Sequence, residues 1–130
     1  MSNNLVKEGF KTAIVTGGSS GIGRGIAQKF IDNGYFVFTI SRSETLSLGL
    51  NHMHICADLS QWDECARSSE IIGEISGGVD VLINNVGLSE WRSIQNIDQH
   101  FFNEMVSLNI GSYVAVTQKI FPYFRKGSSI

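Results

Sequence analysis

The chain of 130 residues alternates short apolar runs with amphipathic or polar stretches. The run Tyr35–Ile40 is aromatic and β-branched without regular alternation, which is typical of a strand buried on both faces of a sheet. Three further runs have strand length and a comparable apolar content. The predicted strands are Lys11–Val15, Tyr35–Ile40, Met53–Leu59 and Val79–Asn84.

Helical patterns follow most of these strands. The first begins in the glycine-rich segment TGGSSGIG and reaches about Asn33. The second spans Gln61–Ile75 with Ser60 as its expected N-cap, and a long one covers Ile97–Phe124. The segment SRSETLSLGLN has room for only a turn or two of helix. This alternation of strands and helices predicts an α/β fold with a doubly wound parallel sheet and right-handed crossovers.

Composition narrows the class of protein. Hydrophobic residues make up 42% of the chain and charged residues 17%, as in an ordinary globular domain. The net charge is −2 and the basic residues are scattered, so we expect no nucleic-acid partner. No apolar run approaches the roughly 20 residues that span a bilayer, so we expect no membrane partner. The cysteines, Cys56 and Cys65, make no disulfide framework, and the start of the chain resembles no export signal. We therefore expect a cytoplasmic protein.

Glycines separate the first strand from the helix that follows it. Gly17 and Gly18 allow a turn too tight for side chains, and Gly21 lets the backbone approach a pyrophosphate. Gly23 lets the new helix pack close to the strand. The helix N-terminus then offers free N–H groups and its positive dipole end to phosphates. The alternative is a structural strand-to-helix turn without a ligand.

The spacing of these glycines excludes two common nucleotide loops. The pattern G-x-x-x-x-G-K-[ST] fails because Arg24 and Gly25 stand where Lys and Ser or Thr would hold a γ-phosphate and Mg²⁺. The dinucleotide pattern G-x-G-x-x-G fails as well. The sequence reads Thr16-Gly17-x-x-x-Gly21-x-Gly23.

This spacing resembles T-G-x-x-x-G-x-G, the first-strand signature of the short-chain dehydrogenase/reductase family. Three further motifs resemble that family in the same order: ADLS at the end of the third strand, NNVG at the end of the fourth, and VSLNIGSYVAVTQKIFPYF in the long helix. The resemblance extends from Lys11 onward and thus over nearly the whole chain.

The resemblance implies a Rossmann-type sheet with strand order 3-2-1-4, in one NAD(P)-binding domain, residues 1–130, that ends before the catalytic strand and helix. It implies that Asp58 meets the adenine and that Asn109 is a catalytic residue, which helps hold a water for a proton relay. Val86 is slightly bulkier than the alanine usual there. The cofactor-binding residues that it implies are Thr16, Gly17, Ser19, Ser20, Gly21, Ile22, Gly23, Ser41, Arg42, Asp58, Leu59, Asn85, Val86 and Gly87.

The end of the second strand bears on the choice of dinucleotide. An acidic residue about 20 positions past the glycines binds the ribose 2′-OH of NAD, whereas an arginine suits NADP. Here Ser41 stands at that position and Arg42 follows it. A serine and a guanidinium can bind a 2′-phosphate that a carboxylate would repel. NADP(H) is favoured and NAD(H) remains possible, since Arg42 could instead be a solvated charge paired with Glu44.

Periodicity gives Asn109 a second interpretation. It lies in the middle of an apolar stripe with i, i+4, i+7 spacing along the long helix. The residues of the stripe are Phe102, Val106, Asn109, Tyr113, Val116, Ile120 and Phe124. An amide there must be hydrogen-bonded, so the residues alone favour a satisfied core asparagine. The family resemblance favours the catalytic role.

His52, His54 and Cys56 alternate along the third strand and would share one face, a spacing that could ligate zinc. A strand buried under helices explains the three residues more simply, so we expect no metal. His100 is expected to be exposed. Trp91 and Arg92 follow NNVG, where the family resemblance implies part of the substrate pocket, although a surface loop explains them equally well.

The family's reaction transfers hydride between the nicotinamide and an alcohol or carbonyl, with a tyrosine as acid/base, a lysine four residues on and a serine. The sequence contains no Tyr-x-x-x-Lys, and GSSI stands where the serine's strand would begin. We therefore expect an oxidoreductase by family whose 130 residues are catalytically incomplete and inactive alone. The alternative is a non-catalytic dinucleotide-binding fragment or remnant. Epimerase-like relatives with T-G-x-x-G-x-x-G are disfavoured by the glycine spacing.

Two expectations about partners follow. The substrate is a small carbonyl or alcohol whose identity the sequence does not give, because the family sets specificity mostly in the missing part. The edge of the fourth strand, DVLIN, is apolar and expected to be unpaired, which favours pairing with another chain. The resemblance also implies that the long helix packs at a subunit interface. We therefore expect a homo-oligomer.

Overall fold

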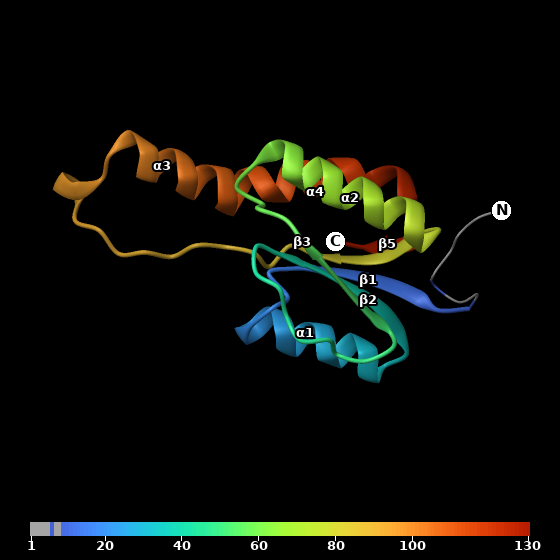
Figure 1. Cartoon of the computed structure of the whole chain (residues 1–130). Coiled ribbons are helices and arrows are strands. Elements are labelled where there is room, and N and C mark those ends of the chain that lie inside the picture. Colours follow the sequence, from blue (N-terminus) through green and yellow to red (C-terminus); the bar gives the residue numbers. More distant parts are fainter. Residues whose placement is uncertain (1–5, 7–8) are drawn as a thin grey trace.

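The computed structural model describes residue 6 and residues 9–130, and in this part of the chain the strands form a parallel sheet (Figure 1). Its order is β3-β2-β1-β4-β5. The strands are β1 (Lys11–Thr16), β2 (Tyr35–Ser41), β3 (His52–Cys56), β4 (Val79–Ile83) and β5 (Phe124–Ser129). The predicted α/β class, the parallel pairing and the order 3-2-1-4 are confirmed, with one more strand beside β4.

Helices cover both faces of this sheet. Figure 1 shows α1 on one face and α2 and α4 on the other, while α3 extends away from the sheet. The helices are α1 (Gly21–Asp32), α2 (Trp62–Ser76), α3 (Gln99–Val106) and α4 (Ser112–Ile120), with the π turn η2 (Ser107–Gly111) and the 3₁₀ turns η1 (Ile94–Asn96) and η3 (Phe121–Tyr123). A helix layer on each face is the doubly wound architecture that the sequence predicted.

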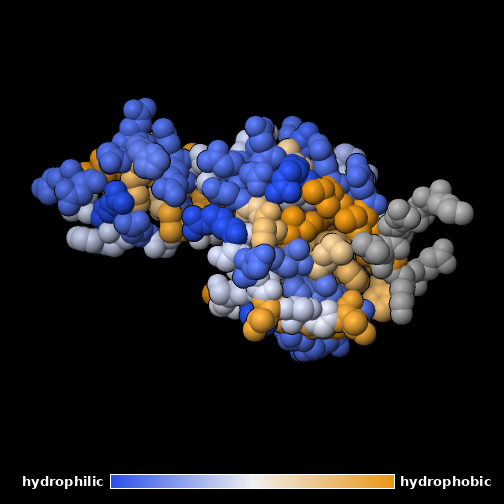
Figure 2. All heavy atoms as spheres, viewed as in Figure 1, coloured by the Kyte–Doolittle hydropathy of each residue, from blue (hydrophilic) through white to orange (hydrophobic). Residues whose placement is uncertain are grey.

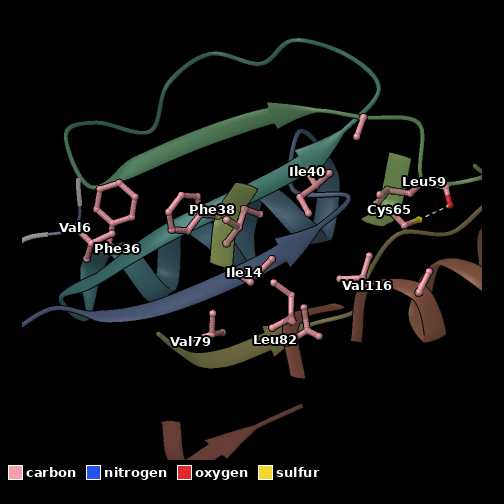
Figure 3. Close-up of a cluster of buried hydrophobic side chains, with 14 residues drawn as sticks. Val6, Ile14, Phe36, Phe38, Ile40, Leu59, Cys65, Val79, Leu82 and Val116 are labelled. Carbon is pink, nitrogen blue, oxygen red and sulfur yellow. Dashed lines mark hydrogen bonds between the residues drawn. The ribbon is translucent and has the colours of Figure 1, made fainter. Parts of the chain in front are cut away.

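The core has two parts because the central strands are buried on both faces. Ile14 joins the cluster under α2 and α4, whereas its neighbours Ala13 and Val15 pack with Ala27 of α1. Figure 3 shows the first cluster, in which Phe38 and other β2 side chains lie near those of β1 and β4. Successive residues of a strand point to opposite faces, so burial on both sides removes the alternation from the sequence.

The predicted helical segment over Ile97–Phe124 is confirmed in extent, because α3, η2, α4 and η3 follow one another without a gap from Gln99 to Tyr123, but it is not one regular α-helix. The π turn η2 separates α3 from α4, and Pro122 stands in the 3₁₀ turn that follows α4. The stripe predicted along one face is also divided, since Phe102 is 58% exposed whereas Ile120 is fully buried. A π turn has more residues per turn than an α-helix, which shifts the side chains that follow it around the axis.

The predicted open edge of β4 is also wrong. Residues 124–129 form β5 and pair in parallel with β4, at Val79↔Phe124 and Val81↔Ser129 with an irregular register between them. Arg125 Nη1 donates to Asp80 Oδ2 over 2.6 Å, and the same oxygen accepts the Thr12 N–H at 2.8 Å. The strand therefore starts at Phe124, earlier than GSSI, and one carboxylate of β4 ties both neighbouring strands to it.

Figure 2 shows a mostly hydrophilic surface in this view, with hydrophobic side chains gathered between the layer of α2 and α4 and the sheet. Within the described residues, no helix has both the length and the apolar character needed to cross a membrane.

Candidate functional site

A cleft of about 430 Å³ opens at the carboxyl ends of the strands, next to the glycine loop. It lies where the strand order reverses between β1 and β4, the point at which open α/β sheets bind ligands. Twelve of the predicted cofactor-binding residues line it: Gly17, Ser19, Ser20, Ile22, Gly23, Ser41, Arg42, Asp58, Leu59, Asn85, Val86 and Gly87. Thr16, Gly21 and Asn109 are not among the residues that line the cleft.

The glycine loop is tight because neighbouring atoms already fill the space that side chains at Gly17, Gly18 and Gly23 would occupy. A Cβ on Gly17, whose φ is +67°, would lie 3.0 Å from Val86 Cα, and one on Gly18 would lie 2.5 Å from the Thr39 methyl carbon. A Cβ on Gly23 would overlap the carbonyl oxygen of Gly17. By contrast, a Cβ on Gly21 would meet no atom within 4 Å, so the backbone here faces open space.

The start of α1 carries nothing that would repel an anion. Its first turn has no acidic residue, and Ser20 at the N-cap makes no side-chain capping hydrogen bond. The first N–H groups of a helix have no partner within the helix, and the macrodipole adds a partial positive charge there. The loop and this helix end can therefore bind a phosphate or pyrophosphate.

Thr16 lies behind the cleft and joins β1 to the segment after β4. Its Oγ1 accepts the N–H groups of Asn85 at 3.0 Å and Val86 at 3.1 Å and donates to the Ile83 carbonyl at 3.4 Å. In return, Asn85 Nδ2 donates to the carbonyl oxygens of Thr16 and Gly17. The first residue of the glycine motif thus holds the NNVG segment against the loop.

Asp58 is fixed beside the cleft by the residue predicted to cap α2. Its Oδ1 accepts both the backbone N–H of Ser60 at 3.0 Å and the Ser60 hydroxyl at 2.7 Å. The predicted N-cap is therefore wrong, because Ser60 is used in this turn and α2 begins at Trp62 behind Gln61. Nearby Cys65 is buried, donates to the Leu59 carbonyl, and has its pKa raised to about 11 by burial and by the charge of Asp58. It stays a thiol at neutral pH.

Asn109 lies in the π turn and binds one residue of the loop after β4. Its Oδ1 accepts the Leu88 N–H at 2.8 Å, and its Nδ2 donates to the Leu88 carbonyl at 2.9 Å. The amide is therefore satisfied, as the core interpretation required, and it holds a segment that lines the cleft. π turns inside α-helices are frequent at functional sites.

Ser41, Arg42 and Ser43 form the rim of the cleft at the end of β2. The Ser41 hydroxyl donates to the Ser43 carbonyl at 3.0 Å. Arg42 is exposed, and no ion pair joins it to Glu44 within the described residues. The guanidinium is thus available to an anionic ligand.

Six further residues, which were not among the predicted cofactor-binding residues, also line the cleft: Ser43, Ala57, Ser60, Leu88, Glu104 and Leu108. Ala57 and Ser60 lie within the ADLS motif, and Ser43 and Leu88 directly follow predicted cofactor-binding residues, so these four could have been found by taking whole motifs and extending them by one residue. Glu104 and Leu108 lie four residues apart on the helix of Asn109, so helical spacing was their signal.

The two histidines of β3, His52 and His54, form hydrogen bonds with Thr39. His52 Nε2 and His54 Nδ1 lie 2.8 and 2.7 Å from Thr39 Oγ1. Among the residues described, no three or more His, Cys, Asp or Glu side chains gather where they could hold a metal ion.

Comparisons with known proteins agree with this geometry. Residues 11–129 match the profile of the short chain dehydrogenase family. The chain is 32% identical over 127 residues to the rhamnolipids biosynthesis 3-oxoacyl-[acyl-carrier-protein] reductase of Pseudomonas aeruginosa, covering 92% of this chain and 50% of the reductase. The chain thus spans half of that relative's length, and 40–46% of the length of the next seven curated relatives.

Two solved structures are similar in fold and carry different dinucleotides. The Pseudomonas aeruginosa RhlG/NADP active-site complex superposes with a TM-score of 0.77 at 28% identity, over 99% of this chain and 53% of that one. The NADH-dependent reductase A1-R′ complexed with NAD superposes with a TM-score of 0.81 at 29% identity, over 95% of this chain and 54% of that one.

Gly23→Ala should destabilise the fold, because its methyl group would overlap the Gly17 carbonyl and crowd Asn85 Nδ2 at 2.5 Å. We expect the free energy of unfolding in urea to fall by about 3 kcal/mol. Gly25→Ala on the same helix is the matched control, since a Cβ there meets no atom within 4 Å. It should change stability by no more than about 1 kcal/mol, in the stabilising direction. Equal effects of the two substitutions would contradict the close packing at Gly23.

Proposed function

This chain belongs to the short-chain dehydrogenase family, and on that premise we propose that its cleft binds NADP(H) for hydride transfer between the nicotinamide and an alcohol or carbonyl. The observation that carries the proposal is the cleft itself, where the glycine loop, the start of α1, Asp58 and the NNVG segment converge. The glycine loop and helix end would hold the pyrophosphate, and Asp58 the adenine. The residues present fit the cofactor, because the backbone at Gly21 faces open space and α1 starts without an acidic residue.

The choice of NADP(H) rests on the rim at Ser41 and Arg42. No carboxylate stands at the end of β2, so a 2′-phosphate would meet hydroxyl groups and a guanidinium free of any ion pair with Glu44. A guanidinium binds a phosphate through forked, charge-assisted hydrogen bonds. The similar NADP complex supports this choice, while the similar NAD complex shows that the fold accepts either dinucleotide.

In the reaction, the cofactor supplies or accepts hydride at its nicotinamide. This chain's own residues bind it and set the walls around it. Asn109 would act through the backbone of Leu88, which its amide holds at the cleft, and through the π turn in which it lies. The substrate class is a small alcohol or carbonyl compound.

Arg42→Ala should weaken NADPH binding selectively. Loss of a charge-assisted contact to the 2′-phosphate should raise the Kd for NADPH roughly 10- to 100-fold. The Kd for NADH, which lacks that phosphate, should change less than about twofold. Titration calorimetry with both cofactors measures the difference, and Lys29→Ala at the far end of α1 is the control for loss of one positive charge. Equal losses for both cofactors would overturn the assignment of Arg42.

The 130 residues should bind the cofactor without turning it over. They contain no Tyr-x-x-x-Lys, so no tyrosine acid/base with a paired lysine is available to a bound carbonyl. With NADPH and a panel of ketones, aldehydes and 3-oxoacyl thioesters, absorbance at the reduced nicotinamide band should fall no faster than without protein. Turnover that disappears on Gly21→Val would contradict this and would assign the acid/base to a residue of the present chain. The second candidate function, a dinucleotide-binding module, agrees with binding alone.

Self-association should occur through the outer side of the helix that carries Asn109. Phe102, Val106, Ile110 and Val114 recur every four residues there and are all exposed. We propose that a second copy covers this stripe. Gel filtration with light scattering should give a mass above that of one chain, and Val114→Lys should shift it toward the monomer. Leu50→Lys, at an exposed apolar residue of the loop after β2, is the control and should leave the mass unchanged. A monomeric wild type would refute the proposal.

A further inference from the structure

The loop between β2 and β3 carries the rim residues Arg42 and Ser43, directly after Ser41 at the end of β2, and contains no helix. In doubly wound folds a crossover helix normally packs this connection against the sheet. Here residues 42–51 run beside α1 (Figure 1) and are held by side-chain hydrogen bonds. Arg24 of α1 donates to Thr45 Oγ1 at 3.0 Å and to the Leu46 carbonyl at 3.3 Å. Two histidines of β3 hold the same loop from its other side.

These histidines and Thr39 form a continuous hydrogen-bonded chain, here called the histidine–threonine chain. The backbone N–H of Leu48 donates to His52 Nδ1 at 3.0 Å. His52 Nε2 then lies 2.8 Å from Thr39 Oγ1, which lies 2.7 Å from His54 Nδ1. His54 Nε2 ends the chain 2.9 Å from the Ser43 carbonyl. The histidine–threonine chain thus begins at Leu48 and ends at Ser43, two residues of the same loop.

The direction of every proton in this chain follows from its first donor. Because the Leu48 N–H can only donate, His52 Nδ1 must be a bare lone pair and the proton must be on Nε2. That N–H donates to Thr39 Oγ1, whose own proton goes to His54 Nδ1. His54 must then carry its proton on Nε2, where it donates to the Ser43 carbonyl. All five groups are satisfied only when both imidazoles are neutral.

A proton added to either ring breaks this order. On His52 Nδ1 it would face the Leu48 N–H, donor against donor. On His54 Nδ1 it would point at Thr39 Oγ1, which already accepts from His52, and the buried Thr39 hydroxyl would lose its acceptor. Burial and the positive charges of His54 and Arg24 lower the pKa of His52, which also favours the neutral form. His52 therefore contributes stability above its ordinary pKa that is lost as the pH falls.

The charged residues around the pair are few. On α1, Arg24 is nearest to the loop, while Lys29 and Asp32 lie in the last turn of the helix. The neighbouring strand β2 carries no charged residue. Arg42 and Glu44 belong to the loop itself. No carboxylate among the described residues forms an ion pair with either imidazole, so none compensates a proton placed there.

Thr39 also links the chain to the glycine loop. Its methyl group occupies the space in which a Cβ of Gly18 would lie, at 2.5 Å. Ser41, on the same strand, places its hydroxyl 3.3 Å from His54 Nε2. His54, at one end of the histidine–threonine chain, thus contacts Ser41 and Ser43 of the rim. Thr39, at its centre, lies against Gly18 of the glycine loop.

We propose that His54, aligned by Thr39 and His52, is a positioning residue for NADP(H) selectivity: in its neutral form it fixes Ser43 and Ser41 so that Arg42 faces the ribose 2′-phosphate. The inference rests on the proposed function, because it concerns the same rim. It adds that the preference for NADPH over NADH depends on a residue that does not contact the cofactor, and that this preference declines when His54 is protonated.

The test compares Kd values for NADPH and NADH at pH 8.0 and 5.5. His54→Leu removes the donor to Ser43 and should raise the NADPH Kd about fivefold while the NADH Kd changes less than twofold. His54→Gln keeps an amide donor that does not titrate, and it should bind NADPH nearly as the wild type does at pH 8.0. His100→Gln, at the exposed third histidine, is the matched control and should behave as the wild type. Unchanged NADH binding shows that each variant is folded.

Measurements at the two pH values distinguish the effect of His54 from that of protonating the ligand's own 2′-phosphate. The 2′-phosphate itself takes up a proton near pH 6, so NADPH binding should weaken at pH 5.5 in every variant. The wild type and His100→Gln should lose more of their NADPH preference than His54→Gln does. Equal losses in wild type and His54→Gln would overturn the inference, as would a His54→Leu variant that keeps the NADPH preference or weakens both cofactors alike. A wild type without NADPH preference would overturn the proposed cofactor as well.

The proton order has a readout that needs no cofactor. Nitrogen-15 NMR of the imidazole rings distinguishes the two neutral tautomers and the cation. At pH 7.5 both His52 and His54 should be protonated at Nε2 and bare at Nδ1. An Nδ1–H tautomer of either strand histidine would overturn the inference whatever the cofactor preference.

Discussion

The hydroxyl group of Thr16 is the interaction on which the site depends. It accepts two successive backbone N–H groups from the segment after β4, at 3.0 and 3.1 Å, where the chain leaves the sheet. Backbone donors at the end of a strand need partners that the sheet no longer provides. By supplying one acceptor for both, Thr16 brings Asn85 and Val86 against Gly17 and leaves no room for a side chain there. The close approach of glycine loop, α1 and NNVG follows from this contact.

A second buried threonine repeats this arrangement on the next strand. Thr39 pairs with Val15 in the sheet, one residue before the pairing of Thr16 with Ile40, so the two threonines point to opposite faces. Both are β-branched, which suits a strand, and both are fully buried with their hydroxyl groups hydrogen-bonded. A valine would fit either position in shape but would leave several polar groups without partners.

The sequence predicted those features that depend on local pattern. Strands β1 to β4 and the turn at the glycine loop follow from composition and spacing over a few residues, and these strands were predicted largely correctly. Most of the residues that the family resemblance implied for cofactor binding line the cleft. Features that depend on distant contacts were missed. Asn109 binds Leu88, Arg125 binds Asp80, and the histidines bind a loop on either side of Thr39. No periodicity records such pairs, so the π turn, the pairing of β5 with β4 and the histidine–threonine chain came only from the structure.

A loop packed by a crossover helix and a loop held by polar side chains respond differently to pH. A crossover helix packs through apolar contacts, which do not respond to pH between 5 and 8. The loop after β2 is held instead by polar side chains, two of which are the imidazoles of His52 and His54. Because the order of donors admits a single protonation state, the loop is firmly held only while both rings are neutral. The rim proposed to select NADP(H) is therefore held by polar contacts that include two imidazoles, whereas the glycine loop proposed to hold the pyrophosphate depends on glycines and a threonine that do not titrate. Acidification should then reduce selectivity before it abolishes binding.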